Sequence, residues 1–302
     1  TDDAGTADDA GDDLTTADTF AISVTAVNDP PTLGSLDGTT LDYTEGDGAV
    51  VIDSGDTSSV SDPDSSDFDG GSLTVSLTNG TSSDTLSVAS DGTITLDSGT
   101  VYYDAAGSSA TDTSIGTVSG GDSGTDLVIT LTSDASEAAT TALFQAISFE
   151  NSSDTPDTTS RTATFTLDDW DSGDSTASAA VTITITEVND APVLSDFDGE
   201  TLAYTQGDGV VVLDSQELAS VTDADSTDFD GGTLTYAVSA TPTGSLDTHV
   251  QLGIATTNKI SLSGSDVNYD NGDSDITIGT VSGGSDSTDL VVTFDSNATP
   301  TN

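Results

Sequence analysis

The chain repeats itself at a fixed distance of 161 residues. The segment VNDPP at 27–31 returns as VNDAP at 188–192, and the acidic segment at 61–71 returns at 222–232. A period of this length is that of a whole domain, so tandem copies of one folded unit are expected. Because an active site is usually built once per protein, the function should lie in what a row of like modules does.

The period divides the chain into three parts. Residues 1–26 align with 162–187 and are expected to be the closing segment of a preceding repeat. Residues 27–187 form a complete repeat, and 188–302 form a second repeat that lacks its C-terminal part. The joints fall at 27–31 and 188–192, where proline ends one strand and the chain crosses stiffly to the next module.

Short segments with alternating apolar and polar residues predict strands that have one buried face. They lie at 20–25, 73–77, 127–131, 162–167 and 181–185. Turns rich in Gly, Asp, Asn and Ser separate them, and helices do not alternate with them. An all-β fold of tandem antiparallel β-sandwich modules is therefore predicted. Tyr43 and Tyr204 recur at the period and are expected in the two cores.

One segment in each repeat is expected to be helical. Asp134 is placed to cap a helix, Glu137 has the spacing of a capping box, and apolar residues follow up to Phe144. This pattern predicts one short helix that leads into a strand at 146–149.

The charge of the chain favours cations as partners. Fifty-four acidic residues face only Arg161, Lys259 and the single His249, which gives a net charge of -52. Nucleic-acid binding is excluded because it needs clustered Lys and Arg, and anionic membrane surfaces would repel the chain. No apolar stretch approaches the roughly 20 residues of a membrane span, so membrane insertion is not expected. His249 has no His or Cys partner and is expected in a surface loop.

The acidic residues are mostly aspartates, and the chain has no cysteine. Aspartates number 48 and glutamates six. The short Asp carboxylate favours turns and binds hard cations close to the backbone. The absence of cysteine excludes disulfides and thiol metal sites, so sheet packing and bound ions must supply stability.

The joints and their acidic segments resemble the cadherin-like tandem repeats of large secreted bacterial adhesins, which are RTX-type proteins often exported by type I systems. The resemblance covers essentially the whole chain and is strongest at 160–169, 188–192 and 223–225. It implies a cadherin-like, immunoglobulin-like fold, an extracellular or cell-surface location, and Ca²⁺ at each joint. In that family the ion is held by the linker, by a distal Asp-x-Asp pair and by acids of the preceding domain.

The resemblance assigns candidate calcium ligands at both joints. At the second joint they are Glu187, Asn189 and Asp190 from the linker, Asp223 and Asp225 as the distal pair, and Asp168, Asp169 and Asp171 from the preceding domain. At the first joint they are Asn28 and Asp29 with the distal pair Asp62 and Asp64, while Ala26 stands where the leading acid is expected. Calcium takes six to eight oxygen ligands, and carboxylates without a cation repel one another, so a joint stiffened by calcium is predicted.

Several acidic segments have a second interpretation. The alternative for the distal Asp-x-Asp pairs is that they are solvated turn residues in a chain so rich in Asp, but their repetition at a matched distance from the joint favours calcium. The segment DFDGG at 67–71 fits an Asx turn or a second cation loop. Trp170, the only tryptophan, could stack on a sugar or pack over the joint.

The function predicted from these patterns is that of a calcium-stiffened structural or extender repeat of an extracellular bacterial adhesin or matrix fibre, with neighbouring repeats as partners. A first alternative is a self-assembling filament, sheath or surface-layer subunit, a homopolymer formed when segment 20–25 adds to the second repeat of another copy. A further alternative is a carbohydrate- or ice-binding module, although no regular Thr-x-Thr array is evident. Catalysis is not expected, because no cationic electrophile or Gly-rich phosphate loop accompanies the carboxylates.

Overall fold

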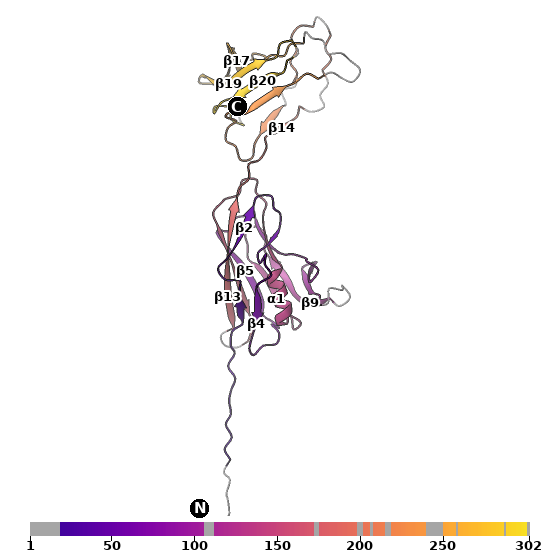
Figure 1. Ribbon diagram of the computed structural model, residues 1–302, viewed down its shortest axis with the longest axis vertical. Helices are drawn as coiled ribbons and strands as arrows, with labels where there is room; N and C mark the ends of the chain where they lie inside the picture. The colour runs from indigo at the N-terminus through magenta and orange to yellow at the C-terminus, as the bar shows by residue number, and fades with distance from the viewer. Residues whose placement is uncertain are drawn as a thin grey trace, which may run out of the picture.

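The computed structural model describes residues 19–105, 112–171, 175–197, 202–205, 208–214, 219–239, 250–257, 259–286 and 288–300. Two β-rich bodies lie end to end along its long axis, and the N-terminal segment extends away from the first (Figure 1). We call the body of residues 27–187 the lower body and the body of residues 188–300 the upper body. His249 lies outside the described residues, so its predicted surface position is not addressed.

The lower body contains an eight-stranded sheet and a three-stranded sheet. The large sheet has the order β2-β13-β12-β5-β10-β9-β8-β7, and the small sheet has the order β3-β11-β6. All of their strand pairs are antiparallel except β13 with β2, which is parallel. A separate pair joins β1 to β4.

The strands of the large sheet are β2 (Thr39–Thr44), β5 (Ser72–Thr78), β7 (Ile94–Asp97), β8 (Thr100–Tyr103), β9 (Thr113–Gly120), β10 (Leu127–Leu131), β12 (Arg161–Asp168) and β13 (Thr176–Thr186). The other strands are β1 (Thr32–Gly34), β3 (Val50–Val51), β4 (Ser59–Ser61), β6 (Asp84–Val88) and β11 (Ile147–Asn151). The predicted strands at 73–77, 127–131, 162–167 and 181–185 are thus confirmed.

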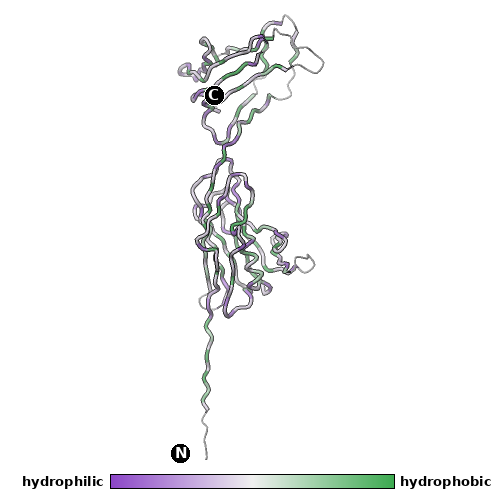
Figure 2. Tube along the Cα trace, in the orientation of Figure 1, coloured by the Kyte–Doolittle hydropathy of each residue, from purple (hydrophilic) through white to green (hydrophobic). Residues whose placement is uncertain are grey.

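One hydrophobic core joins the two sheets of the lower body. Figure 2 shows hydrophobic and hydrophilic residues alternating along these strands, as period-two burial requires. Phe149 of the small sheet meets Tyr43 of the large sheet edge-on, with ring centroids 5.1 Å apart. Phe144 of the helix stacks on Phe165 of β12 at 5.5 Å. All four residues belong to one continuous cluster of buried side chains.

The helix α1 (Glu137–Gln145) lies where the sequence predicts it, but its cap differs. The N-cap is Ser136, whose hydroxyl accepts from the backbone N–H of Ala139, and not Asp134. Glu137 is therefore the first residue of the helix, and its carboxylate accepts instead from the backbone N–H of Asp62 at 2.6 Å. Among the described residues, no helix is long and apolar enough to cross a membrane.

A buried ion pair lies inside the lower body. Arg161 and Asp84 are both 0% exposed, and Arg161 Nε donates to Asp84 Oδ2 at 3.1 Å. The Asn151 side chain and the N–H and hydroxyl of Thr81 also donate to the Asp84 carboxylate. Arg161 Nη1 donates to the carbonyl oxygens of Asp157 and Thr159. The pair thus ties the start of β12 to the start of β6.

The upper body repeats the strand order of the lower body over the part that it contains. Its sheet has the order β16-β20-β19-β18-β17, which corresponds to β5-β10-β9-β8-β7. The pair of β14 with β15 has the register of β1 with β4, shifted by 161 residues. Its strands are β14 (Val193–Ser195), β15 (Ser220–Thr222), β16 (Thr233–Tyr236), β17 (Ile260–Ser263), β18 (Asp266–Asp270), β19 (Asp275–Gly283) and β20 (Leu290–Phe294). Its core is smaller and centres on Val267, Ile278, Val292 and Ala298.

Two predictions about apolar residues are wrong. Residues 20–25 are in no strand, and Phe20, Ile22 and Val24 are 84%, 75% and 87% exposed, because no described strand pairs with this segment. Tyr204 is 59% exposed, whereas Tyr43, its counterpart one period earlier, is 1% exposed. Tyr43 is covered by β11, where its ring meets Phe149 and its hydroxyl donates to the Asn151 carbonyl at 3.1 Å, and the described part of the upper body has no counterpart of β11.

The segment 67–71 forms an Asx turn in both copies. The backbone N–H of Asp69 donates to Asp67 Oδ1 at 3.3 Å, and that of Asp230 donates to Asp228 Oδ1 at 3.0 Å. The turn leads directly into β5 and β16, which agrees with the turn interpretation of this sequence.

Candidate functional site

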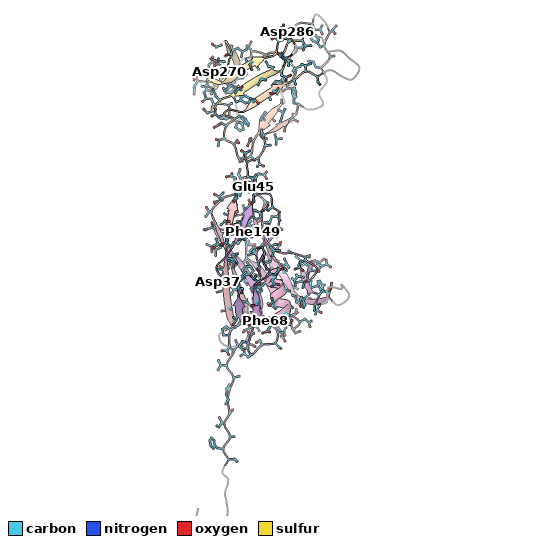
Figure 3. All side chains as sticks on the ribbon, in the orientation of Figure 1. Asp37, Glu45, Phe68, Phe149, Asp270 and Asp286 are labelled. Atoms are coloured by element: carbon cyan, nitrogen blue, oxygen red, sulfur yellow. The ribbon has the colours of Figure 1, made fainter. Side chains whose placement is uncertain are left out.

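The second joint begins where β2 and β13 end together. The two strands run parallel, with Thr44 opposite Thr186, so the residues that follow them emerge at one end of the lower body. The Glu45 N–H donates to the Thr186 carbonyl at 2.9 Å, and the Val188 N–H donates to Glu45 Oε2 at 2.9 Å. Figure 3 places Glu45 at the end of the lower body that faces the upper body. The linker is thereby fixed beside a glutamate.

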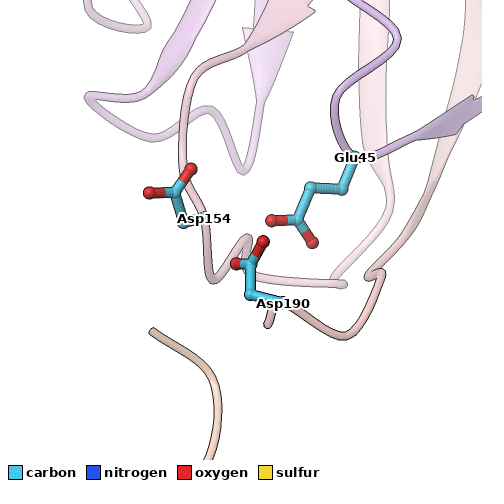
Figure 4. Close-up of side chains that lie close together, drawn as sticks. All are labelled: Glu45, Asp154 and Asp190. Atoms are coloured by element: carbon cyan, nitrogen blue, oxygen red, sulfur yellow. The ribbon is translucent and has the colours of Figure 1, made fainter. Parts of the chain in front are cut away.

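Three carboxylates converge at this joint. Glu45, Asp154 and Asp190 each offer an oxygen, and these atoms all lie within 4.8 Å of one another. Figure 4 shows the carboxylates of Glu45 and Asp190 facing each other, with that of Asp154 beside them. They line a pocket of about 310 Å³ together with Glu150 and Val188, among other residues. Like charges this close repel one another strongly unless a cation or proton lies between them.

The distal pair of the upper body adds two more carboxylates near Asp190. The Asp190 N–H donates to Asp225 Oδ2 at 3.1 Å, and Asp223 Oδ1 accepts from the Ser226 N–H at 2.9 Å. Asp190 Oδ2 and Asp225 Oδ1 are buried with no hydrogen-bond partner among the described residues. Burial raises the pKa of Asp190, and the neighbouring charges raise it further; they belong to Glu45, Asp154, Asp225 and Asp223. The joint therefore holds more negative charge than its own hydrogen bonds satisfy.

The other two linker residues contribute less to this geometry. Asn189 is exposed and its side-chain amide donates to the Asp190 carbonyl at 2.6 Å. Glu187 is exposed directly after the end of β13. The structure thus brings Asp190 to the distal pair Asp223 and Asp225, whereas Asn189 and Glu187 are exposed beside them.

The first joint repeats the main contact of the second. The Asp29 N–H donates to Asp64 Oδ2 at 3.2 Å, as Asp190 does to Asp225 one period later. Asp62 Oδ1 accepts from the N–H groups of Asp64 and Ser65 at 3.1 and 3.0 Å. Asp62 is 8% exposed, and its Oδ2 is buried without a partner among the described residues. Burial is the main cause that raises the pKa of Asp62.

The acids at 168–171 were assigned to the second joint, and this assignment is wrong. Asp169 Oδ2 accepts from the Asn28 side chain at 3.3 Å, and Asp171 Oδ2 accepts from the Ser65 hydroxyl at 3.0 Å, so both lie at the first joint. Asp168, the last residue of β12, accepts from the N–H of Trp170 in the same turn. The reason is that β13, with 11 residues, separates this turn from residue 187 by about 35 Å.

Among the described residues, the carboxylates close enough together to share a metal ion are those of Glu45, Asp154 and Asp190 at the second joint. The orphaned oxygens of Asp62, Asp190 and Asp225 are buried lone pairs that a cation would satisfy. Asp, Asn and backbone oxygens are the ligand types that calcium prefers. At the second joint a cation could be shared by Glu45, Asp154 and Asp190, with Asp225 bonded to the linker beside them. At the first joint the acidic groups in contact with the linker or the distal pair are those of Asp64, Asp169 and Asp171.

Sequence reasoning missed three of the residues around these sites. Glu45 lies at the second joint only because β2 pairs in parallel with β13, and its counterpart one period later is Gln206, so the repeat did not point to it. Asp154 follows β11, and the chain has no residue one period later, so the repeat could not point to it. Glu137 was assigned to a helix cap. The EGDG turn at 45–48, which begins two residues after the predicted core residue Tyr43, was the one signal that could have indicated Glu45.

Comparisons with known proteins return no match. Neither the protein-family models, nor the curated proteins, nor the solved structures contain one. The fold and the site therefore define the class of protein by themselves: an acidic, all-β chain whose joints gather unsatisfied carboxylates.

Proposed function

We propose that this chain is a calcium-stiffened extender segment of an extracellular bacterial adhesin or matrix fibre. The observation that carries the proposal is the contact between linker and distal Asp, which occurs twice at a spacing of 161 residues, as Asp29 with Asp64 and as Asp190 with Asp225. Each contact lies beside buried carboxylate oxygens that have no partner among the described residues. The role is structural, with no catalytic step.

The repeated architecture supports the extender role. We infer that the large and small sheets of the lower body are the two layers of a cadherin-like sandwich, because one core cluster draws side chains from both. The upper body has the same strand order over its described part, which fits a second copy of the module. Two modules that share a short acidic linker can bend when carboxylates repel and become a rod when a cation binds.

The first test measures calcium binding, stability and length together. Extracellular calcium modules bind with a Kd of about 10⁻⁴ to 10⁻³ M, so titration calorimetry should detect ions in that range. In calcium the melting temperature should rise and small-angle scattering should give a longer, stiffer particle than in chelator. An unchanged melting temperature and an unchanged maximum dimension would remove the proposal.

The second test assigns the ion to the joint. The double variant Asp190→Asn with Asp225→Asn keeps the size of both side chains and removes two charged ligands, so calcium at the second joint should be lost. The matched control is Asp122→Asn with Asp126→Asn, which removes two exposed carboxylates from a turn of the lower body. Glu45→Gln, the residue present one period later, should weaken binding about tenfold because affinity follows the number of charged ligands. Equal calcium binding by the two double variants would show that the ion does not bind at the second joint.

Strand addition between copies is a second candidate, favoured by one observation. Phe20, Ile22 and Val24 are largely exposed, whereas Val181, Ile183 and Ile185, their counterparts in β13, are 0%, 0% and 6% exposed. A segment with this pattern can bury its apolar face by pairing with a sheet that offers the place β13 takes between β2 and β12. Electron microscopy of the chain without residues 1–26 tests this candidate, and assemblies that form unchanged would end it.

A further inference from the structure

One face of the large sheet is lined by hydroxyl groups in register. On β5 and β12 the residues Leu73, Val75, Ala163, Phe165 and Leu167 are 0% exposed, so the residues between them face outward. The outward residues are Thr162, Thr164 and Thr166 on β12 and Thr78, Ser76 and Thr74 on β5, and they lie opposite one another in this order. On the other side of β12, Thr182 and Ser178 of β13 continue two of the three rows, and the middle row ends in Ala180, which has no hydroxyl.

These rows form a regular array that the sequence did not make evident. Neighbouring strands lie about 5 Å apart, and alternate residues along a strand lie about 7 Å apart. Each hydroxyl can both donate and accept a hydrogen bond. In a chain with 54 acidic residues, the nine positions of this array hold no charged side chain. Two carboxylates lie at the borders of the array: Asp37 accepts from the backbone N–H of Ala180 at 3.0 Å at the β13 edge, and Asp168 is opposite Ser72 at one end.

Trp170 stands at that end of the array. It follows Asp168 by two residues, and its indole packs against Gly70, which precedes Ser72 by two residues. A Cβ at Gly70 would lie 3.1 Å from Trp170 Cδ1, so glycine allows the ring to lie on the backbone. The backbone N–H of Trp170 donates to Asp168 Oδ1 at 2.9 Å, which fixes the turn. The side chain is nevertheless 72% exposed, an unusual state for the largest apolar residue of the chain.

We propose that this face binds a neutral polysaccharide along β12 and β5, with one sugar ring stacked on Trp170. A sugar with equatorial hydroxyls has an apolar C–H face that suits an indole, and polar edges that suit rows of hydroxyls and the Asp168 carboxylate. The charge of the molecule repels anionic glycans, whereas the uncharged array does not select against neutral ones. The occupant is therefore a neutral polysaccharide and not an acidic one.

The single tryptophan provides a direct measurement. The full chain is titrated with soluble hydroxyethylcellulose, and with alginate as the anionic comparison, while the emission of Trp170 is followed. The neutral polymer should shift the emission to the blue and slow the protein in affinity electrophoresis, and alginate should do neither. The titration is done in calcium and again in chelator, so a joint that binds no calcium leaves this test intact.

Two variants and one control locate the binding face. Trp170→Ala should reduce retardation by the neutral polymer at least tenfold. Thr164→Asp, which places a charge in the middle of the array opposite Ser76 and Ala180, should do the same while Trp170 remains. Thr93→Asp makes the same change at an exposed turn residue before β7 and should bind as the parent chain does.

Three results would overturn the proposal. They are an emission that no neutral polymer shifts, a Trp170→Ala variant that is retarded as strongly as the parent, and equal losses in Thr164→Asp and Thr93→Asp. Inhibition of ice-crystal growth by the parent chain without any response to polysaccharide would assign the array to ordered water, and would also overturn it.

Discussion

Arg161 is one of two basic residues in a chain of net charge -52, and it lies inside the core of the lower body. A surface cation would be expected to lower the repulsion among the acids, yet this one neutralises a single carboxylate, that of Asp84. Its hydrogen bonds to Asp157 and Thr159 hold the loop before β12 as well. Its role is therefore local order, because one buried charge cannot offset the charge of the whole surface.

Arg161→Met should destabilise the lower body by about 4 kcal/mol, because it leaves the Asp84 carboxylate buried without its cation. Lys259→Met is the control for the same loss of charge. Lys259 is exposed and lies 5.6 Å from the centroid of Tyr269, so its loss should change stability by only about 0.5 kcal/mol. Denaturant unfolding measures both, and equal effects of the two variants would contradict a structural role for the ion pair.

Asp53 gives the fold a defined dependence on pH. Burial by itself would raise its pKa, but hydrogen bonds from Ser58 and Thr57 outweigh burial and lower it. Because the folded pKa lies below the unfolded value near 4, the stabilisation is present above about pH 4 and is lost as pH falls through the folded value. Asp53→Asn should therefore cost about 2 kcal/mol at about pH 7 and much less at about pH 2. Urea unfolding at both pH values measures the difference in the free energy of unfolding between the parent and the variant. A difference that does not change with pH would refute this account.

At the scale of elements, the turn between β9 and β10 depends on one glycine, Gly121, whose counterpart in the upper body is Gly284. Gly121 has φ 92°, and a Cβ there would collide with the carbonyl oxygen of Leu86. Gly284 has φ 82° and meets Leu252 in the same way in the upper body. This agreement between the bodies shows that the turn, and not only the strands, belongs to the repeated unit.

Gly121→Ala should cost about 3 kcal/mol, since it combines an unfavourable φ with a backbone collision. Gly92→Ala is the matched control, because Gly92 has φ 95° but no atom within 4 Å of its Cβ position. The control should cost about 1 kcal/mol. Calorimetric melting of both variants separates strain from collision, and equal shifts in melting temperature would refute the collision.

Sequence patterns predicted the position of several strands but not which strands pair with one another. Alternation located β5, β10, β12 and β13, because burial of one face is written into period-two patterns. The same pattern at 20–25 gave no strand, because a strand needs a neighbour that local sequence does not specify. The cap of α1 is Ser136 and not Asp134, because Ser133, Asp134 and Ser136 are all residue types that can cap a helix and the sequence does not rank them. Likewise the repeat located Asp190 and Asp225, whereas Glu45 became visible only with the parallel pairing of β2 and β13.

At the scale of the whole molecule, 54 acidic residues make stability depend on ionic strength. The Debye length falls from about 30 Å at 0.01 M salt to about 3 Å at 1 M, so salt screens the repulsion between surface carboxylates. In chelator the melting temperature should therefore rise by several degrees, roughly 5 °C, between these salt concentrations. In calcium the rise should be smaller, because the closest carboxylates are already neutralised. Scanning calorimetry measures both, and a melting temperature that falls with salt would contradict this view.

The parallel pairing of β2 with β13 decides how the lower body would respond to a pull on its two ends. The chain enters at one end of this body and leaves at the other, and the two strands share six residue pairs from Val181 with Thr39 to Thr186 with Thr44. Tension along the long axis would slide one strand past the other, so these pairs would bear the load together and rupture as a group. A module joined in this way resists extension far better than one whose strands peel apart one hydrogen bond at a time.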